Sequence, residues 1–212
     1  MALSVTSFDE LNKLVGYKVS EPFPDYFRPM RLSQSQKRKR IALAEELEDV
    51  FIELLSAQFY AQQYGASIYT QSTEKARKGY ISALSKLFEP DLYLMNHADE
   101  IVASILLVLY RNADDPYYYS ADRARALAEG ESNSVWNHNE FEEAVKSGKH
   151  YKKWNTIIDG RERDSHHGIN GTTLPINQPF DLPGGLMQYP RDTTYAASMD
   201  EIANCRCSLS FF

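Results

Sequence analysis

The periodicity of the sequence changes at Gly148, and this change constrains the fold more than any other feature. Before Gly148, apolar residues recur at three- and four-residue spacing, which is the pattern of amphipathic helices. After it, short alternating segments are separated by Gly and Pro, which is typical of strands and turns. We therefore expect an α+β chain. Several N-terminal α-helices, one of them long, should precede a small C-terminal domain with a short antiparallel sheet and long Gly/Pro-rich loops.

The N-terminal part predicts helices separated by an extended arm and by loops. The longest helix carries a broad apolar stripe from Leu43 to Tyr64, which favours a helix in a bundle over a coiled coil. The Pro-rich stretch EPFPDYFRP predicts the arm. Gly130 should end one helix before the next begins. The predicted helices cover 8–15, 41–68, 73–88, 91–111, 120–128 and 132–146, and the predicted domains are an arm at 1–35, a helical domain at 36–118 and a C-terminal domain at 119–212.

The C-terminal part predicts short strands at 154–158, 172–176 and 205–211. Asp-Gly and Asn-Gly pairs between the first two are turn signals. The stretches PFDLPGG and QYPRD should be loops. A short helix at 198–203 has Ser198 as its cap and Glu201 at the spacing of a capping box.

Charge and hydropathy limit the partners. The net charge of −6 over 212 residues argues against a DNA-condensing role. The N-terminus lacks the pattern of a secretion signal, and the apolar run at 101–110 is too short to span a bilayer, so we expect no membrane partner. The helix around that run should be the most buried. One basic run either contacts DNA weakly or forms the solvated first turn of a helix; it comprises Lys37, Arg38, Lys39 and Arg40.

Two cysteines near the end of the chain are candidate metal ligands. Cys205 and Cys207 are two residues apart on a predicted strand, so both thiols face the same side. Together with His166, they could hold zinc as a three-residue site. The alternative is that both are small buried residues in a reducing compartment, with no cofactor. The same residues could also serve as a nucleophile and its base, although no oxyanion hole is recognisable.

The polar residues of the Gly- and Pro-rich C-terminal part also have a structural interpretation. Arginine and carboxylate side chains pair bidentately, and such networks fix irregular loops. We therefore expect no catalytic residues and a structural polar lattice made of Asp159, Arg161, Arg163, His166, Asn204 and Arg206.

An ordered set of motifs in the last two fifths of the chain resembles the phage Mu F-like head morphogenesis family. The motifs are a Lys-Trp pair, D-x-R-x-R-x-x-H, G-x-x-x-P, a Phe, a Pro-Asp element and Cys-x-Cys. Here they are formed by Lys153, Trp154, Asp159, Arg161, Arg163, His166, Gly171, Pro175, Phe180, Pro190, Asp192, Asn204, Cys205, Arg206 and Cys207, with Glu131 and Asn137 upstream.

This resemblance implies a non-enzymatic minor head protein of a tailed phage. Such a protein binds the portal, and possible further partners are the major capsid or scaffolding protein. It assists head assembly, DNA packaging or ejection. Its location would be the virion, after synthesis in the host bacterial cytoplasm. The alternative function is a zinc-binding or Cys/His-dependent enzymatic domain delivered with the virion.

Overall fold

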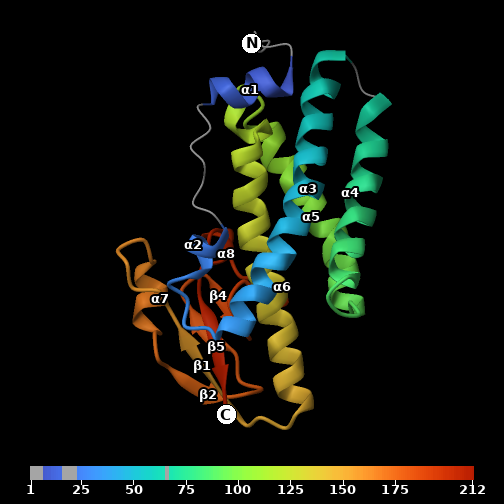
Figure 1. Ribbon diagram of the computed structural model, residues 1–212. Helices are drawn as coiled ribbons and strands as arrows, with labels where there is room; N and C mark the ends of the chain where they lie inside the picture. The colour runs from blue at the N-terminus through green and yellow to red at the C-terminus, as the bar shows by residue number, and fades with distance from the viewer. Residues whose placement is uncertain (1–6, 16–22, 65–66) are drawn as a thin grey trace. The chain divides into compact units, whose positions relative to one another are not determined.

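The computed structural model describes residues 7–15, 23–64 and 67–212, and it confirms the α+β class (Figure 1). Contacts divide the chain into two compact units. The helical unit comprises Met1–Phe23 and Ile41–Glu129, and the mixed unit comprises Pro24–Arg40 and Gly130–Phe212. The expected domain boundaries at 35/36 and 118/119 stay predictions. The helices are α1 (Phe8–Leu14), α2 (Phe23–Phe27), α3 (Gln34–Tyr64), α4 (Ser67–Ser85), α5 (Leu92–Arg111), the 3-10 helix η1 (Pro116–Tyr119), α6 (Ala121–Lys146), α7 (Asp164–Gly168) and α8 (Met199–Ile202).

Helix starts in the helical unit follow their capping residues. The side chain of Ser7 accepts a hydrogen bond from the Glu10 amide at the start of α1, and Asp91 accepts one from Leu94 at the start of α5. The prediction of an extended arm is wrong at residues 23–27, which form the short helix α2. Residues 16–22, which the prediction also covers, lie outside the described residues. Proline is tolerated in α2 because it lies in the first turn.

The core of the helical unit lies along α3 and α5. Helix α3 buries Leu43, Leu47, Phe51, Leu54 and Phe59, all within the predicted apolar stripe. Helix α5 is buried along one face only, with Leu107 51% exposed and Tyr110 58% exposed. The prediction that it is the most buried helix is therefore wrong, because α6 has more buried residues. By length and composition α5 could cross a bilayer, a property that core helices of soluble proteins share.

Helix α6 is continuous where the sequence predicts two helices (Figure 1). Gly130 was expected to end the first of them, but it lies inside α6. A Cβ atom at this position would come within 2.9 Å of Nη1 of Arg191. Glycine is therefore needed here for close packing of the arginine, and not for a left-handed cap.

The mixed unit contains two small sheets. Its three-stranded antiparallel sheet has the order β2-β1-β5, with Trp154 of β1 opposite Leu209 of β5. The stretch PFDLPGG forms a hairpin and not a loop, and Gly185 directly after its turn has a φ of 131°. Buried residues of both sheets, with Trp154 and Phe180 at van der Waals distance, form one apolar core. The strands are β1 (Tyr151–Asn155), β2 (Thr173–Pro175), β3 (Phe180–Leu182), β4 (Gly185–Met187) and β5 (Ser208–Phe211).

One member of the predicted basic run is buried in the mixed unit. The guanidinium of Arg40 is fully buried and donates to both carboxylate oxygens of Glu140, at 2.8 and 2.9 Å. It also donates to the side-chain oxygens of Asn133 and Asn137. Arg40 is therefore not available to a DNA phosphate, and Lys39 lies over the Trp136 ring. DNA contact by the remaining basic residues stays a prediction.

We expect Arg40→Ala to destabilise the mixed unit. The substitution leaves Glu140 and two buried amide groups without their donor, and breaking a buried ion pair in this way costs about 3–5 kcal/mol. The measurement is chemical denaturation. Lys75→Ala is the control, because its partner is Glu53 and both side chains are more than half exposed, so its loss should stay below about 1 kcal/mol. Equal losses for the two variants would contradict this role of Arg40.

A second buried cation, Lys152, should make stability depend on pH. Its Nζ lies over the rings of Phe141 and Phe180 and contacts the Gln188 side chain. Burial lowers the pKa of Lys152 from 10.5 to about 7, although Asp192 opposes the shift. Between these values the unfolded chain binds a proton that the folded chain does not. The free energy of unfolding should therefore rise as the pH increases from about 7 to 10.5.

Lys152→Met should remove this rise and stabilise the protein near pH 7. Chemical denaturation of wild type and variant across the pH range measures both effects. The control is Lys153→Met, because its side chain points to the other face of β1 and is partly exposed. Parallel pH profiles for wild type and Lys152→Met would contradict the assignment of the rise to Lys152.

Candidate functional site

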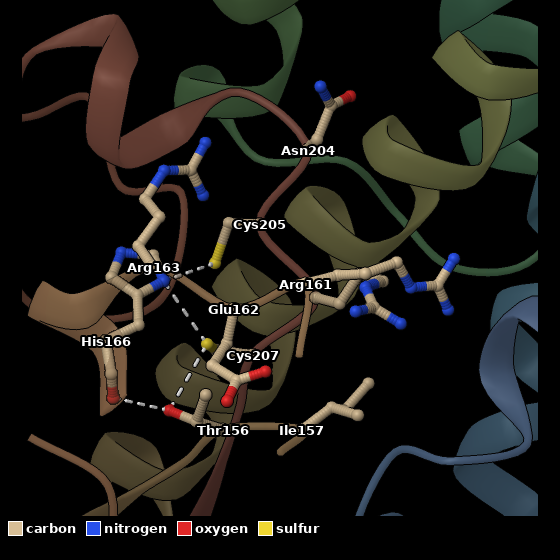
Figure 2. Close-up of a pocket in the computed structure, with 10 residues that line it drawn as sticks. Thr156, Ile157, Arg161, Glu162, Arg163, His166, Asn204, Cys205 and Cys207 are labelled. Carbon is tan, nitrogen blue, oxygen red and sulfur yellow. Dashed lines mark hydrogen bonds between the residues drawn. The ribbon is translucent and has the colours of Figure 1, made fainter. Parts of the chain in front are cut away.

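Two thiols and one imidazole meet inside the mixed unit, and we call them the Cys-His cluster (Figure 2). Asn204 has a φ of 55°, which turns the chain out of α8 into an extended segment. On that segment Cys205 and Cys207 point to the same side, as their spacing predicts, and they are 1% and 3% exposed. His166 comes from α7, a helix that the sequence analysis missed, and it is 2% exposed.

The ligand atoms of the cluster all lie within 4.8 Å of one another. Nδ1 of His166 is 3.6 Å from Sγ of Cys205 and 3.5 Å from Sγ of Cys207. A tetrahedral zinc with Zn–S bonds of about 2.3 Å and Zn–N bonds of about 2.0–2.1 Å separates sulfur from nitrogen by roughly 3.5–3.6 Å. Hydrogen bonds between thiol and imidazole have the same length. The spacing thus fits a metal site without requiring one.

The imidazole is held from its other side by Glu201. Nε2 of His166 lies 3.0 Å from a carboxylate oxygen of Glu201, which is itself 5% exposed. The contact has the length of an ion pair, but it is bent, so Nε2 has no well-aligned hydrogen-bond acceptor. The same oxygen accepts a hydrogen bond from the Ser165 hydroxyl at 2.8 Å. Glu201 therefore does not complete the predicted capping box with Ser198, whose side chain makes no capping bond.

Further contacts fix the backbone on both sides of the cluster. The carbonyl of Cys207 accepts hydrogen bonds from the side chains of Asn133 and Asn137 on α6, at 3.0 and 3.2 Å. The hydroxyl of Thr156 donates to the carbonyl of His166 at 2.8 Å. None of these roles was predicted from the sequence. Asn137 was singled out by the motif pattern, whereas no signal pointed to Asn133 or Thr156.

The two thiols have opposite pKa shifts because they share a proton. The pKa of Cys205 is lowered, chiefly by a hydrogen bond from Cys207, with help from His166. The pKa of Cys207 is raised by the same contact and by burial. The pair thus favours one thiolate and one thiol. A divalent cation would stabilise the second negative charge, since zinc is bound by thiolates.

The predicted polar lattice forms only in part, and at the surface. Asp159 accepts two hydrogen bonds from Arg206, at 2.7 and 2.8 Å, and one from Nη2 of Arg161 at 3.0 Å. These arginines hold the pKa of Asp159 well below its usual range. Arg163 instead donates to the carbonyl of Ala203, while Asn204 is exposed and His166 belongs to the cluster. The lattice thus lies around the cluster's edge and is not buried.

A small cavity of about 20 Å³ adjoins all three residues of the cluster. This volume holds about one water molecule. The cysteine thiols contact the imidazole of His166, and this imidazole contacts the carboxylate of Glu201. A nucleophilic triad of the type Cys–His–Glu has the same series of contacts. A space of this size has no room beside the sulfur atoms for a substrate of more than a few atoms. The arrangement therefore suits metal binding better than nucleophilic catalysis, and the Cys-His cluster can hold a metal ion.

Comparison with known proteins gives one informative similarity. No protein-family model and no solved structure matches the chain. Over 197 residues the chain is 27% identical to a protein of Enterococcus faecalis named NAD(+)--arginine ADP-ribosyltransferase EFV. The matched region covers 91% of this chain and 37% of the relative, so the chain spans little more than a third of the relative's length.

These findings correct the resemblance to the head morphogenesis family. No family model supports it, and the matched relative is named as an enzyme, so the interpretation as a non-enzymatic head protein is overturned. The motif residues have another explanation in the fold. Trp154 and Phe180 fill the core, and Asp192 is fully buried and accepts hydrogen bonds from the amides of Gln188 and Thr194. Such residues specify packing and not a biological role.

The expected portal and capsid partners and the virion location were implied by the same resemblance. No observation on this structure bears on them, and they stay predictions of the sequence analysis.

Proposed function

We propose that the mixed unit binds one zinc ion through His166, Cys205 and Cys207. The observation that carries this proposal is the spacing of one imidazole nitrogen from two sulfur atoms, at 3.5 and 3.6 Å in a buried site. Both values agree with tetrahedral zinc coordination. Zinc would then act as a fixed link between α7 and the segment that leads into β5.

The surroundings of His166 support the same proposal. A histidine that binds metal through one nitrogen usually presents its other nitrogen to a carboxylate, which fixes the ring and raises its basicity. Glu201 has this position next to Nε2, while Nδ1 faces the sulfur atoms. Among the described residues, the buried Nε2 has no well-aligned hydrogen-bond partner. The positive charge of a bound metal would strengthen the contact between the His166 imidazole and the Glu201 carboxylate.

Zinc content can be measured directly. The purified chain should contain close to one zinc per molecule by elemental analysis, and His166→Ala or Cys207→Ser should lose it. His167→Ala is the matched control, because the neighbouring imidazole is on the same helix but its side chain is 62% exposed. Removal of the metal with a chelator should lower the melting temperature of wild type and leave that of His166→Ala unchanged. A wild-type chain that binds no added zinc would contradict the proposal.

A second candidate function follows from the similarity alone. We propose that the chain is part of an enzyme that transfers ADP-ribose from NAD⁺ to arginine, as the name of the relative states. The chain spans 37% of that relative, so this activity is carried over as a proposal. The cavity beside the Cys-His cluster is far too small for a dinucleotide. The NAD⁺ site of such an enzyme would therefore be separate from the proposed zinc site.

Labelled NAD⁺ tests this candidate. The chain, loaded with zinc, should transfer label to an arginine-rich acceptor peptide and not to the same peptide with lysine in place of arginine. His166→Ala should reduce transfer only as far as it reduces folding, because the proposed zinc site does not bind NAD⁺. Absence of any transfer would exclude this activity for the chain and would leave the zinc proposal untouched.

A further inference from the structure

We infer that the proposed zinc site keeps one open coordination position, which a water molecule or a small anion fills. This inference rests on the proposed zinc binding and deepens it. Structural zinc sites have four protein ligands, whereas zinc sites with three protein ligands hold an exchangeable ligand in the fourth position. The question is whether the chain supplies a fourth ligand.

Among the residues that the structure describes, the cluster offers three ligand atoms. Glu162 is the acidic residue of the cavity lining, but its carboxylate is engaged elsewhere. One of its oxygens accepts hydrogen bonds from the amides of Asp159 and Gly160 at 3.0 and 2.8 Å, and the other faces His167. Glu201 lies beyond the imidazole, next to Nε2. Neither carboxylate is therefore placed to complete a tetrahedron.

The cavity of about 20 Å³ lies where a ligand from outside could enter. It is lined by all three members of the cluster, and its volume corresponds to about one water molecule. Figure 2 shows the two sulfur atoms and the imidazole converging within this lining. A fourth ligand of one or a few atoms fits here. A phosphate, with its four oxygens, does not.

The charge around the cavity selects among small ligands. Arg161, Arg163 and Arg206 all line it, and only Glu162 does so with negative charge. Asp159 pairs with Arg206 and Arg161 from outside the lining, whereas Arg163 pairs with no carboxylate of the described residues and donates to the carbonyl of Ala203. With two thiolates on a divalent zinc the centre itself is neutral. The arginines therefore favour a small anion, or water in its deprotonated form, over a neutral organic ligand.

Cobalt(II) in place of zinc provides a spectroscopic test that does not depend on activity. The metal-free chain is reconstituted with cobalt(II), and its visible spectrum is followed while sodium azide, which coordinates through a terminal nitrogen, is added. We expect a saturable change in the ligand-field bands with azide and none with equal concentrations of inorganic phosphate. Arg163→Gln should weaken azide binding about three- to tenfold, whereas Arg163→Lys should weaken it less, because the charge is retained.

The control variant is Arg77→Gln, since Arg77 pairs with Asp99 in the helical unit, and its azide affinity should equal that of wild type. Cobalt content and spectrum before azide addition show that each variant still forms the centre. A cobalt-loaded chain whose spectrum responds neither to azide nor to thiocyanate would overturn the open position and leave metal binding in place. A chain that binds no cobalt would instead overturn the proposed function. Equal azide affinities for wild type and Arg163→Gln would overturn the role of Arg163.

Discussion

The contact of one imidazole nitrogen with two sulfur atoms is the interaction on which the mixed unit depends. It joins α7 to the extended segment before β5, and these segments are separated by the whole hairpin β3–β4. The carbonyl of Cys207 adds a second link, because two asparagine side chains of α6 hold it. Both cysteines belong to the apolar core of the unit, and the His166 ring packs edge-on against Trp154. Loss of the cluster would therefore affect the whole small core around Trp154.

The sequence predicted the elements whose signals are local. The Cys-x-Cys spacing correctly placed both thiols on one side, and the predicted helices at 8–15 and 91–111 agree with α1 and α5 to within one residue at each end. Gly130 shows where local signals fail, since its role depends on the approach of Arg191 from a distant loop. The capping-box interpretation of Glu201 failed for a similar reason, because Ser165 and His166 are its partners. Contacts of this kind arise only when the fold brings distant residues together.

The residues that pack the mixed unit and the residues that could carry its chemistry are largely different. Some residues that suggested a head protein, such as Trp154 and Phe180, fill the core, whereas others, including His166 and both cysteines, form the Cys-His cluster. The chemistry is concentrated in three buried residues and the arginines around them. The similarity to an ADP-ribosyltransferase covers most of this chain but only 37% of the relative. A zinc-stabilised unit is compatible with an enzyme whose nucleotide site lies elsewhere, since the cavity beside the cluster has a volume of about 20 Å³.

X-ray absorption spectroscopy at the zinc edge tests the central claim most directly, because it reports the type and distance of the atoms bound to the metal. The account predicts two sulfur neighbours at about 2.3 Å and two lighter neighbours at about 2.0–2.1 Å, one of them an imidazole. The second lighter neighbour is the ligand from outside the chain. A shell without sulfur, or one with four sulfur atoms shared between chains, would contradict a centre built from His166, Cys205 and Cys207.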